Sequence, residues 1–158
     1  MNVVSEAIGE LCKAILPINE EYYLGNPDSK IAVCTLSSIK LLKNFSNSKI
    51  LKDISIAGRL LSENKGIDSI VEYVYKNQKT MTIIVCGKEV WGHKSGHSLF
   101  QLNKNGIDKN KRIIGSNSPD PFLTVSISKV RYFQNNVKLV NLINEIDYED
   151  VLKKIPNS

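Results

Sequence analysis

The stretch Thr82-Ile83-Ile84-Val85-Cys86-Gly87 decides the fold class of this 158-residue chain. A short apolar run that is rich in β-branched side chains and closed by glycine is typical of a strand buried on both faces. Runs of the same kind lie at residues 31–36, 54–58 and 112–115, and a further apolar run spans residues 137–143. These segments are predicted to be the strands of one sheet.

Helical patterns separate these runs. Apolar residues spaced three and four apart predict a helix over residues 64–77, and further helices are predicted over about 96–105, 128–136 and 147–154. Helices that alternate with nearly continuous apolar strands indicate right-handed crossovers between parallel strands. The sequence therefore predicts an α/β, Rossmann-like fold, with a mostly parallel sheet and helices on both of its faces.

The amino-terminal residues carry an amphipathic pattern of their own. Helical spacing predicts a helix over about residues 3–16, which Pro17 ends and which covers the outside of the domain. Its apolar face consists of Val4, Ala7, Ile8, Leu11 and Ile15. Because 158 residues suffice for one continuous core, residues 1–158 are predicted to form a single domain.

The composition excludes several classes of protein. Hydrophobic residues at 42% and charged residues at 23% lie near globular averages, which excludes a disordered or fibrous chain. The three cysteines are far apart, so a reducing, cytoplasmic location is expected in place of a disulfide framework. Every apolar run is much shorter than the roughly 20 residues of a membrane-spanning helix, so no membrane segment is expected in this chain.

The candidate ligand site follows from the predicted topology. In open parallel sheets, ligands bind beyond the carboxyl ends of the strands, where the loops that enter the helices collect. Here those loops are residues 35–38, 58–64, 87–98 and 115–121. We expect the functional residues among them.

The third of these loops carries both histidines of the protein, within Cys86-Gly87-Lys88-Glu89-Val90-Trp91-Gly92-His93-Lys94-Ser95-Gly96-His97-Ser98. Gly87, Gly92 and Gly96 allow the backbone to approach a bulky ligand closely. His93 is available there as a neutral imidazole ligand or as an acid/base group. The alternative is structural: His93 caps the next helix or hydrogen-bonds a loop carbonyl.

Other interpretations of this segment fit less well. His93 and His97 are four residues apart and suit two zinc ligands on one helix, with Cys86 or Glu89 as a third, but Gly96 weakens such a helix. The spacing of the glycines in this segment does not match that of the phosphate-binding loop. No Gly-x-Gly-x-x-Gly follows any predicted strand either. His93-Lys94-Ser95-Gly96 does match half of the Asp-x-His-x-x-Gly motif of corrinoid proteins, although Trp91 occupies the Asp position.

The chain as a whole resembles the A subunit of tetrahydromethanopterin S-methyltransferase, from about residue 16 to residue 154. The amino-terminal half of the resemblance rests on Tyr23-x-Gly25-x-Pro27, Ala32-Val33-Cys34-Thr35-Leu36, Ile56-Ala57-Gly58 and Glu63-Asn64-x-Gly66-Ile67. The other half rests on Cys86-Gly87-x-Glu89-Val90-x-Gly92-His93-x-x-Gly96-x-Ser98, Asn105-Gly106-Ile107-Asp108 and Lys111-Arg112-Ile113-Ile114-Gly115.

This resemblance implies a protein that holds a cobalt corrinoid, either cobalamin or 5-hydroxybenzimidazolylcobamide. In the family the corrinoid takes a methyl group from methyl-tetrahydromethanopterin and passes it to coenzyme M. His93 aligns with the histidine proposed there as the lower axial cobalt ligand, and Glu89 or a backbone carbonyl is expected to bond its other ring nitrogen. The remaining cofactor-binding residues are expected to be Leu36, Gly58, Asn64, Gly87, Glu89, Gly92, Gly96, Gly115, Ser118, Pro119 and Pro121.

Two departures from the family pattern bear on function. The family usually has Gln where Trp91 and His97 stand, so the polar surroundings of the ring are expected to differ. Full-length members end in a transmembrane helix, which this sequence lacks, so a soluble homologue or a truncated soluble domain is expected. Such a chain is not expected to be catalytically complete alone, and other methyltransferase subunits are its expected partners.

Two alternatives remain open from the sequence. The first is storage or delivery of the cobamide without methyl transfer. The second is a Rossmann-like module for an anionic ligand such as a nucleotide, which the net charge of +5 and Lys109, Lys111 and Arg112 permit. No aromatic residues are interleaved with these cations, so nucleic acid is not an expected partner.

Overall fold

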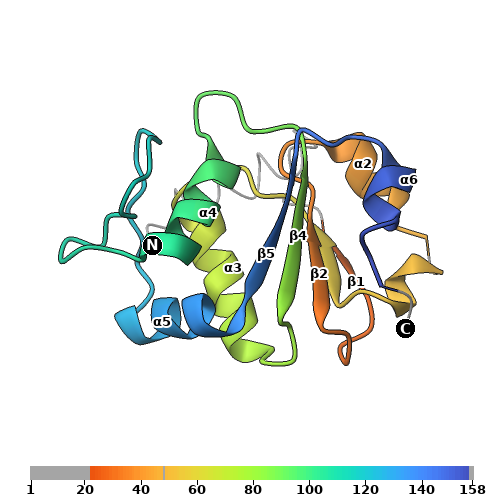
Figure 1. Cartoon of the computed structure of the whole chain (residues 1–158), viewed down its shortest axis with the longest axis horizontal. Coiled ribbons are helices and arrows are strands. Elements are labelled where there is room, and N and C mark those ends of the chain that lie inside the picture. The colour runs from red at the N-terminus through yellow and green to blue at the C-terminus, as the bar shows by residue number, and fades with distance from the viewer. Residues whose placement is uncertain (1–21, 48, 157–158) are drawn as a thin grey trace, which may run out of the picture.

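The computed structural model describes residues 22–47 and 49–156, which contain one five-stranded sheet (Figure 1). Its strands are β1 (Tyr22–Leu24), β2 (Ile31–Cys34), β3 (Ile56–Gly58), β4 (Thr82–Gly87) and β5 (Lys138–Ile143), in the spatial order β1-β3-β2-β4-β5. Strands β3, β2, β4 and β5 are mutually parallel, and only β1 runs antiparallel to its neighbour. The predicted α/β class with a mostly parallel sheet is confirmed.

Helices cover both faces of the sheet (Figure 1). One face carries α3 (Lys65–Lys76), α4 (Ser95–Asn105) and α5 (Ile127–Asn136), and the other carries α2 (Ile39–Asn44), the 3-10 helix η1 (Ile50–Lys52) and α6 (Tyr148–Leu152). Alternate residues of β4 divide between the two cores: Ile83 and Val85 pack with α3 and α4, while Ile84 packs with α2. This division explains why β4 reads as a continuous apolar run.

The predicted strand over residues 112–115 is wrong. Of this run only Ile113 is fully buried, whereas Ile114 is 44% exposed, and the run forms isolated bridges from Ile113 to Ile107 and from Arg112 to Phe122. Its backbone forms hydrogen bonds within the same loop, since Ile113 N–H donates to the carbonyl of Pro121. The segment is therefore a folded loop outside the sheet.

The strand missing from the prediction is β1, which lies shortly before a turn at Pro27. It has three residues and pairs on one side only, so it lacks the long apolar run of a central strand. Helix α2 also went unpredicted, because it has six residues and a single buried pair, Leu41 and Leu42. The helix expected over residues 3–16 lies outside the described residues.

Tight turns bring the carboxyl ends of the strands together. At the end of β4, Gly87 adopts φ +79°, and a Cβ atom at this position would lie 2.1 Å from the carbonyl oxygen of Thr35. Only glycine permits this close approach between the β4 and β2 ends. In the described part of the chain, no helix has the length and apolar character needed to cross a membrane.

Candidate functional site

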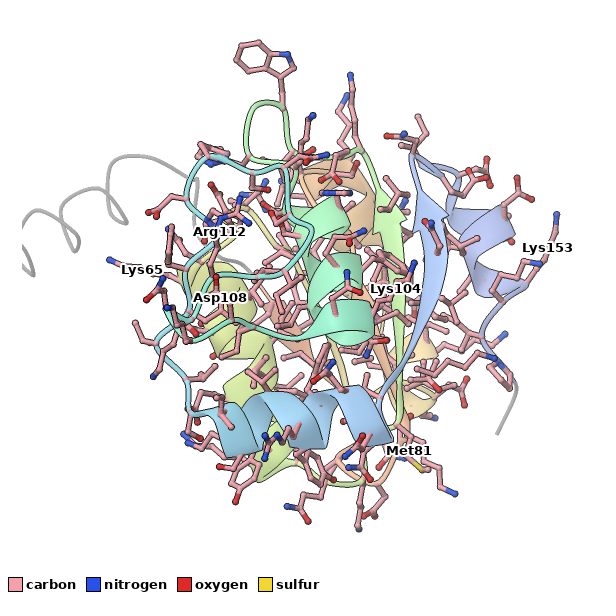
Figure 2. The ribbon with its side chains drawn as sticks, turned by 60° about the vertical axis from the view of Figure 1, so that its left-hand side comes forward. Lys65, Met81, Lys104, Asp108, Arg112 and Lys153 are labelled. Carbon is pink, nitrogen blue, oxygen red and sulfur yellow. The ribbon has the colours of Figure 1, made fainter. Side chains whose placement is uncertain are left out.

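Three segments meet beyond the carboxyl ends of the strands: the β3–α3 loop, the β4–α4 loop and the long loop after α4. The third segment bears Asp108 and Arg112 and lies on the same side of the molecule as Lys65, at the start of α3 (Figure 2). Hydrogen bonds join the three, since Glu63 contacts both His93 and the backbone of Asp120. Three of the four predicted loops therefore meet around His93. The fourth, residues 35–38, is joined to the β4–α4 loop, because Ser37 and Ser38 form hydrogen bonds with the backbone of Lys88.

His93 and Glu63 form the central polar contact of this site. The Nδ1 atom of His93 lies 2.8 Å from Oε2 of Glu63. The Glu63 side chain is buried, whereas 55% of the His93 side chain is exposed. A carboxylate accepts only, so Nδ1 carries the hydrogen and the neutral ring keeps its lone pair on Nε2. The contact thus fixes a tautomer that is suited to metal ligation through Nε2.

The environment of Glu63 keeps its carboxyl group ionised. Burial raises the pKa of Glu63, but hydrogen bonds from its own backbone N–H, from Asp120 N–H and from the His93 ring together lower this pKa below its ordinary value. The Asp120 N–H donates to Oε1 at 3.0 Å, which leaves Oε2 for His93. Both oxygens of the buried carboxylate therefore have partners, as a buried charge requires.

Glu89, which with a backbone carbonyl was one of two candidates to bond the second ring nitrogen of His93, has a different role. Its Oε1 accepts from the backbone N–H groups of Val90 and Gly96, and its Oε2 accepts from that of His97. Helix α4 begins after Lys94, whose φ is +48° and whose side chain makes no capping bond. The carboxylate of Glu89 satisfies the free N–H groups of this helix end. The partner of His93 is Glu63, so that expectation is corrected.

The ring of His97 forms its hydrogen bond with a different segment, the loop after α4. Its Nε2 accepts from the backbone N–H of Asn117, at 3.3 Å. A zinc site with His93 and Cys86 or Glu89 is not formed, because no group of three metal-binding side chains comes together within residues 22–47 and 49–156. His93 is therefore the better placed of the two histidines for a ligand that arrives from outside.

A buried cluster of serine hydroxyls ties the third segment to α4. The Oγ atom of Ser98 lies 2.6 Å from those of both Ser116 and Ser118. Ser118 in turn donates to the carbonyl of His93. The predicted site residue Ser118 thus supports the His93 backbone from behind and is itself buried.

The other predicted residues divide into a near and a far group. Asn64 lies beside the pair: it caps α3 and donates through Nδ2 to Asp120 at 2.9 Å. Gly92 precedes His93 with φ +79° and with open space where a Cβ would stand. Pro119 is exposed next to Asp120, whereas Pro121 is buried. These four belong to the loops that surround His93.

The far group shapes the site from beneath or lies outside it. Leu36 is fully buried in the core, and its side chain would lie 3.1 Å from a Cβ on Gly96 in the first turn of α4. Gly87 closes β4 against Thr35. Gly115 packs against Gln101 on a later turn of α4, and Gly58 faces a separate pocket beside β1. The structure does not bring these residues onto the exposed surface around His93.

Two of the three basic side chains that suggested an anionic ligand donate hydrogen bonds to backbone carbonyls. Arg112 donates to the carbonyls of Ile113 and Ser116, and Lys111 donates through Nζ to the carbonyl of Thr124. These bonds hold the loop after α4 in its shape. Two of the three basic side chains therefore serve the fold.

Glu63 is the functional candidate that sequence reasoning missed. It precedes the α3 cap by one residue and lies 30 positions from His93, so no local spacing links the two. Only the predicted topology could have linked them, since the loops after β3 and β4 both follow the carboxyl ends of parallel strands. The rule that a ligand histidine has a carboxylate partner would have directed a search there.

Comparison with known proteins supplies the family. The family model for the A subunit of tetrahydromethanopterin S-methyltransferase matches residues 12–158. The A subunit of a "Putative methyltransferase Mtx" from Methanosarcina acetivorans is 38% identical over 87% of this chain and 66% of its own length. The A subunit of tetrahydromethanopterin S-methyltransferase from Methanosphaera stadtmanae is 34% identical over 85% of this chain and 53% of its own.

A third relative, an A subunit of the same methyltransferase from Methanothermobacter thermautotrophicus, is 31% identical over 87% of this chain and 57% of its own length. The chain thus spans between about half and two thirds of these relatives. The match over nearly all of its residues shows that the chain belongs to the family of tetrahydromethanopterin S-methyltransferase A subunits.

Proposed function

We propose that this chain is a corrinoid-binding methyl carrier, with His93 as the lower axial ligand of cobalt. The observation that supports this most strongly is the bond between Nδ1 of His93 and the buried carboxylate of Glu63. Histidines that ligate metals almost always donate their other N–H to a carboxylate, a carbonyl or water. The half-exposed ring of His93 and the open space at Gly92 fit a bulky planar group that approaches from solvent.

A bound cobamide supplies the methyl-transfer chemistry itself, because its cobalt is the atom that accepts and releases the methyl group. The residues of this chain then have three tasks. Glu63 holds the His93 ring in one orientation and raises the basicity of Nε2. Ser118 fixes the backbone of His93, and Glu89 fixes the beginning of α4 just beyond it.

We further propose that the carrier works with partner subunits, with methyl-tetrahydromethanopterin as methyl donor and coenzyme M as acceptor. The support is the family, whose members are named as one component of a methyltransferase. The pure chain, mixed with a cobamide and both substrates, should give no sustained turnover. Addition of the partner subunits should be needed to reach an enzymatic rate.

Equilibrium dialysis against hydroxocobalamin and electron paramagnetic resonance of the Co(II) form test the proposal. The wild-type chain should retain about one corrinoid per molecule, with nitrogen hyperfine splitting that changes when histidine carries ¹⁵N. His93→Ala should lose this splitting, whereas the matched control His97→Ala should keep it. Retention of the splitting in His93→Ala, or no retained corrinoid in the wild-type chain, would contradict the proposal.

A further inference from the structure

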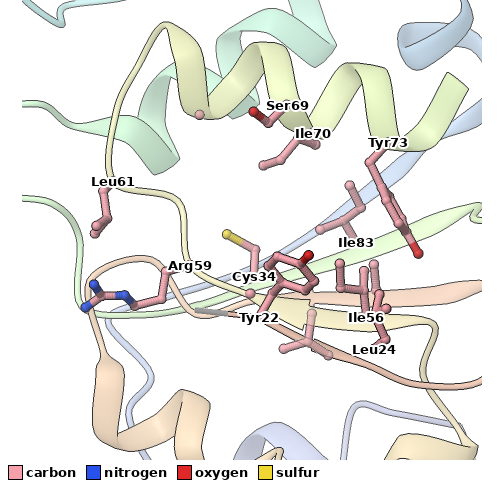
Figure 3. Close-up of a pocket in the computed structure, with 14 residues that line it drawn as sticks. Tyr22, Leu24, Cys34, Ile56, Arg59, Leu61, Ser69, Ile70, Tyr73 and Ile83 are labelled. Atoms are coloured by element: carbon pink, nitrogen blue, oxygen red, sulfur yellow. The ribbon is translucent and has the colours of Figure 1, made fainter. Parts of the chain in front are cut away.

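A pocket at the β1 edge of the sheet does not include His93 and has no role in the proposed function. Its volume of about 380 Å³ lies between the sheet and α3 (Figure 3). Small-molecule sites usually have volumes of about 300–1,000 Å³. Tyr22 and Leu24 of β1 line the pocket and are 59% and 66% exposed, so a small molecule can enter it from solvent at this edge.

The walls of the pocket are mainly apolar. Ile56 of β3 and Ile83 of β4 contribute to the side formed by the sheet, and Ile70 and Tyr73 contribute to the side formed by α3. Ile56, Ile70 and Tyr73 pack against the core but are only partly buried. They therefore keep apolar surface that a bound ligand would remove from water, which favours a ligand with an apolar body.

One charged side chain lies at an end of this apolar pocket. Arg59 directly follows β3, and Figure 3 shows it near Leu61, at the end opposite Tyr73. Of the described residues that line the pocket, Arg59 is the only one that carries a charge at neutral pH. Its Nη1 donates to the carbonyl of Ser37 at 3.5 Å, which places the guanidinium beside the loop after β2. A guanidinium has five N–H donors in a planar fork, so Arg59 can hold a carboxylate and keep this bond.

The other polar groups of the walls add no second charge. Ser69 donates its hydroxyl to the carbonyl of Lys65 within α3. Burial raises the pKa of Cys34 to about 12, so its thiol is neutral. Tyr22 and Tyr73 contribute phenol groups, which are uncharged near neutral pH. Because the described walls contain neither a carboxylate nor a second cation, a polyanion such as a nucleotide would lack partners for its further charges.

We propose that this pocket binds an amphipathic carboxylate, a molecule with an apolar body and one anionic end, such as a medium-chain fatty acid. The apolar body lies between the sheet and α3, and the carboxylate accepts hydrogen bonds from Arg59. A neutral apolar molecule of the same length fits the same walls but gains nothing from the positive charge, so the charge sets the preference. The inference is independent of the proposed cobamide site.

Methyl-group NMR titrations of the full chain test the inference, with octanoate as the probe and octan-1-ol as its uncharged match. Octanoate should shift the methyl signals of Ile56 and Ile70 and should bind about tenfold more tightly than octan-1-ol, as expected for a charge-assisted hydrogen bond. Arg59→Gln should remove this difference, whereas Arg59→Lys should retain part of it because the positive charge remains. The exposed Arg131 of α5 provides the matched control, since Arg131→Gln should leave both affinities unchanged.

Three outcomes would overturn the inference. Unchanged methyl signals of Ile56 and Ile70 at millimolar octanoate would show that the pocket does not take this class of ligand. Equal affinities of the wild-type chain for octanoate and octan-1-ol would show that Arg59 does not recognise the carboxylate. Displacement of bound octanoate by hydroxocobalamin would assign the pocket to the corrinoid instead.

Discussion

The Nδ1 atom of His93 lies 2.8 Å from Oε2 of Glu63, although 30 positions separate the two residues in the chain. The contact joins the loop after β3 to the loop after β4, and both loops begin at the carboxyl ends of parallel strands. An aspartate two residues before the histidine would supply a comparable carboxylate locally, but Trp91 stands there and is almost fully exposed. The fold therefore provides from a distant loop what the local sequence lacks.

Glu63→Gln should weaken both the fold and the orientation of His93. A glutamine offers one acceptor oxygen, so either Asp120 N–H or the His93 ring loses its partner in a buried place. Unfolding in urea should show a loss of about 1–3 kcal/mol. The ¹⁵N shifts of neutral His93 should indicate the Nδ1–H tautomer in the wild-type chain and a mixture with Nε2–H in the variant.

The exposed Glu149 provides the control for that substitution. Glu149→Gln should change the free energy of unfolding by less than about 0.5 kcal/mol, as is usual for surface substitutions. An unchanged tautomer in Glu63→Gln would show that the carboxylate does not orient the ring.

Two glycines with the same φ of +79° should respond very differently to alanine. Gly87→Ala places a Cβ 2.1 Å from the Thr35 carbonyl oxygen, whereas Gly92→Ala places it in open space. Gly92→Ala should cost only the left-handed strain of about 1–2 kcal/mol. Gly87→Ala should cost several kcal/mol more, because β2 and β4 must move apart, and equal costs in urea unfolding would contradict this account.

The elements that were best predicted from the sequence are those whose burial produces a clear pattern of apolar residues. Thr82 to Gly87 has both faces covered, so its run of apolar residues identified β4 and, with the intervening helices, the class of fold. Residues 112–115 show a similar but shorter run without forming a strand, since only Ile113 is drawn into the core. A four-residue apolar pattern does not reveal whether a sheet edge is available to it.

The location of the candidate site could be predicted from the sequence, but the hydrogen bonds between its residues could not. Parallel topology predicted that the loops at the strand ends lie close together, and three of them do meet around His93. The roles of Glu63 and Glu89 could not be assigned, because both carboxylates stand near helix starts in the sequence. Which one caps a helix and which one bonds the imidazole depends on the path of each loop in space.

The two described cysteines should be unreactive in the native protein. Burial raises the pKa of Cys34 to about 12 and that of Cys86 further still, so neither forms the nucleophilic thiolate at pH 8. In a Cys12→Ser background, an aromatic disulfide reagent should titrate no thiol within minutes at pH 8 and two thiols in urea. Rapid labelling of either thiol without denaturant would contradict the buried positions.

The same shifts predict how stability depends on alkaline pH. Unfolded thiols lose their protons near pH 8.5, whereas the folded Cys34 thiol keeps its proton to about pH 12. Between these values the unfolded state binds fewer protons, so the free energy of unfolding falls as pH rises, by up to about 1.4 kcal/mol per pH unit for each thiol. Cys34→Ala should make this decline shallower from about pH 8.5, where the unfolded thiol loses its proton, up to about pH 12, where the folded thiol loses its own.

Glu89→Ala should destabilise α4 without breaking the contact between His93 and Glu63. The substitution removes the acceptor of the Gly96 and His97 N–H groups, and Lys94 provides no side-chain cap in its place. Loss of a capping acceptor costs about 1–2 kcal/mol, and Glu89→Gln should cost less because it keeps one acceptor oxygen. Urea unfolding should rank the stabilities as wild type, Glu89→Gln and Glu89→Ala, with the Nδ1–H tautomer of His93 retained in all three. Loss of that tautomer in Glu89→Ala at unchanged stability would assign to Glu89 the positioning role that the geometry gives to Glu63.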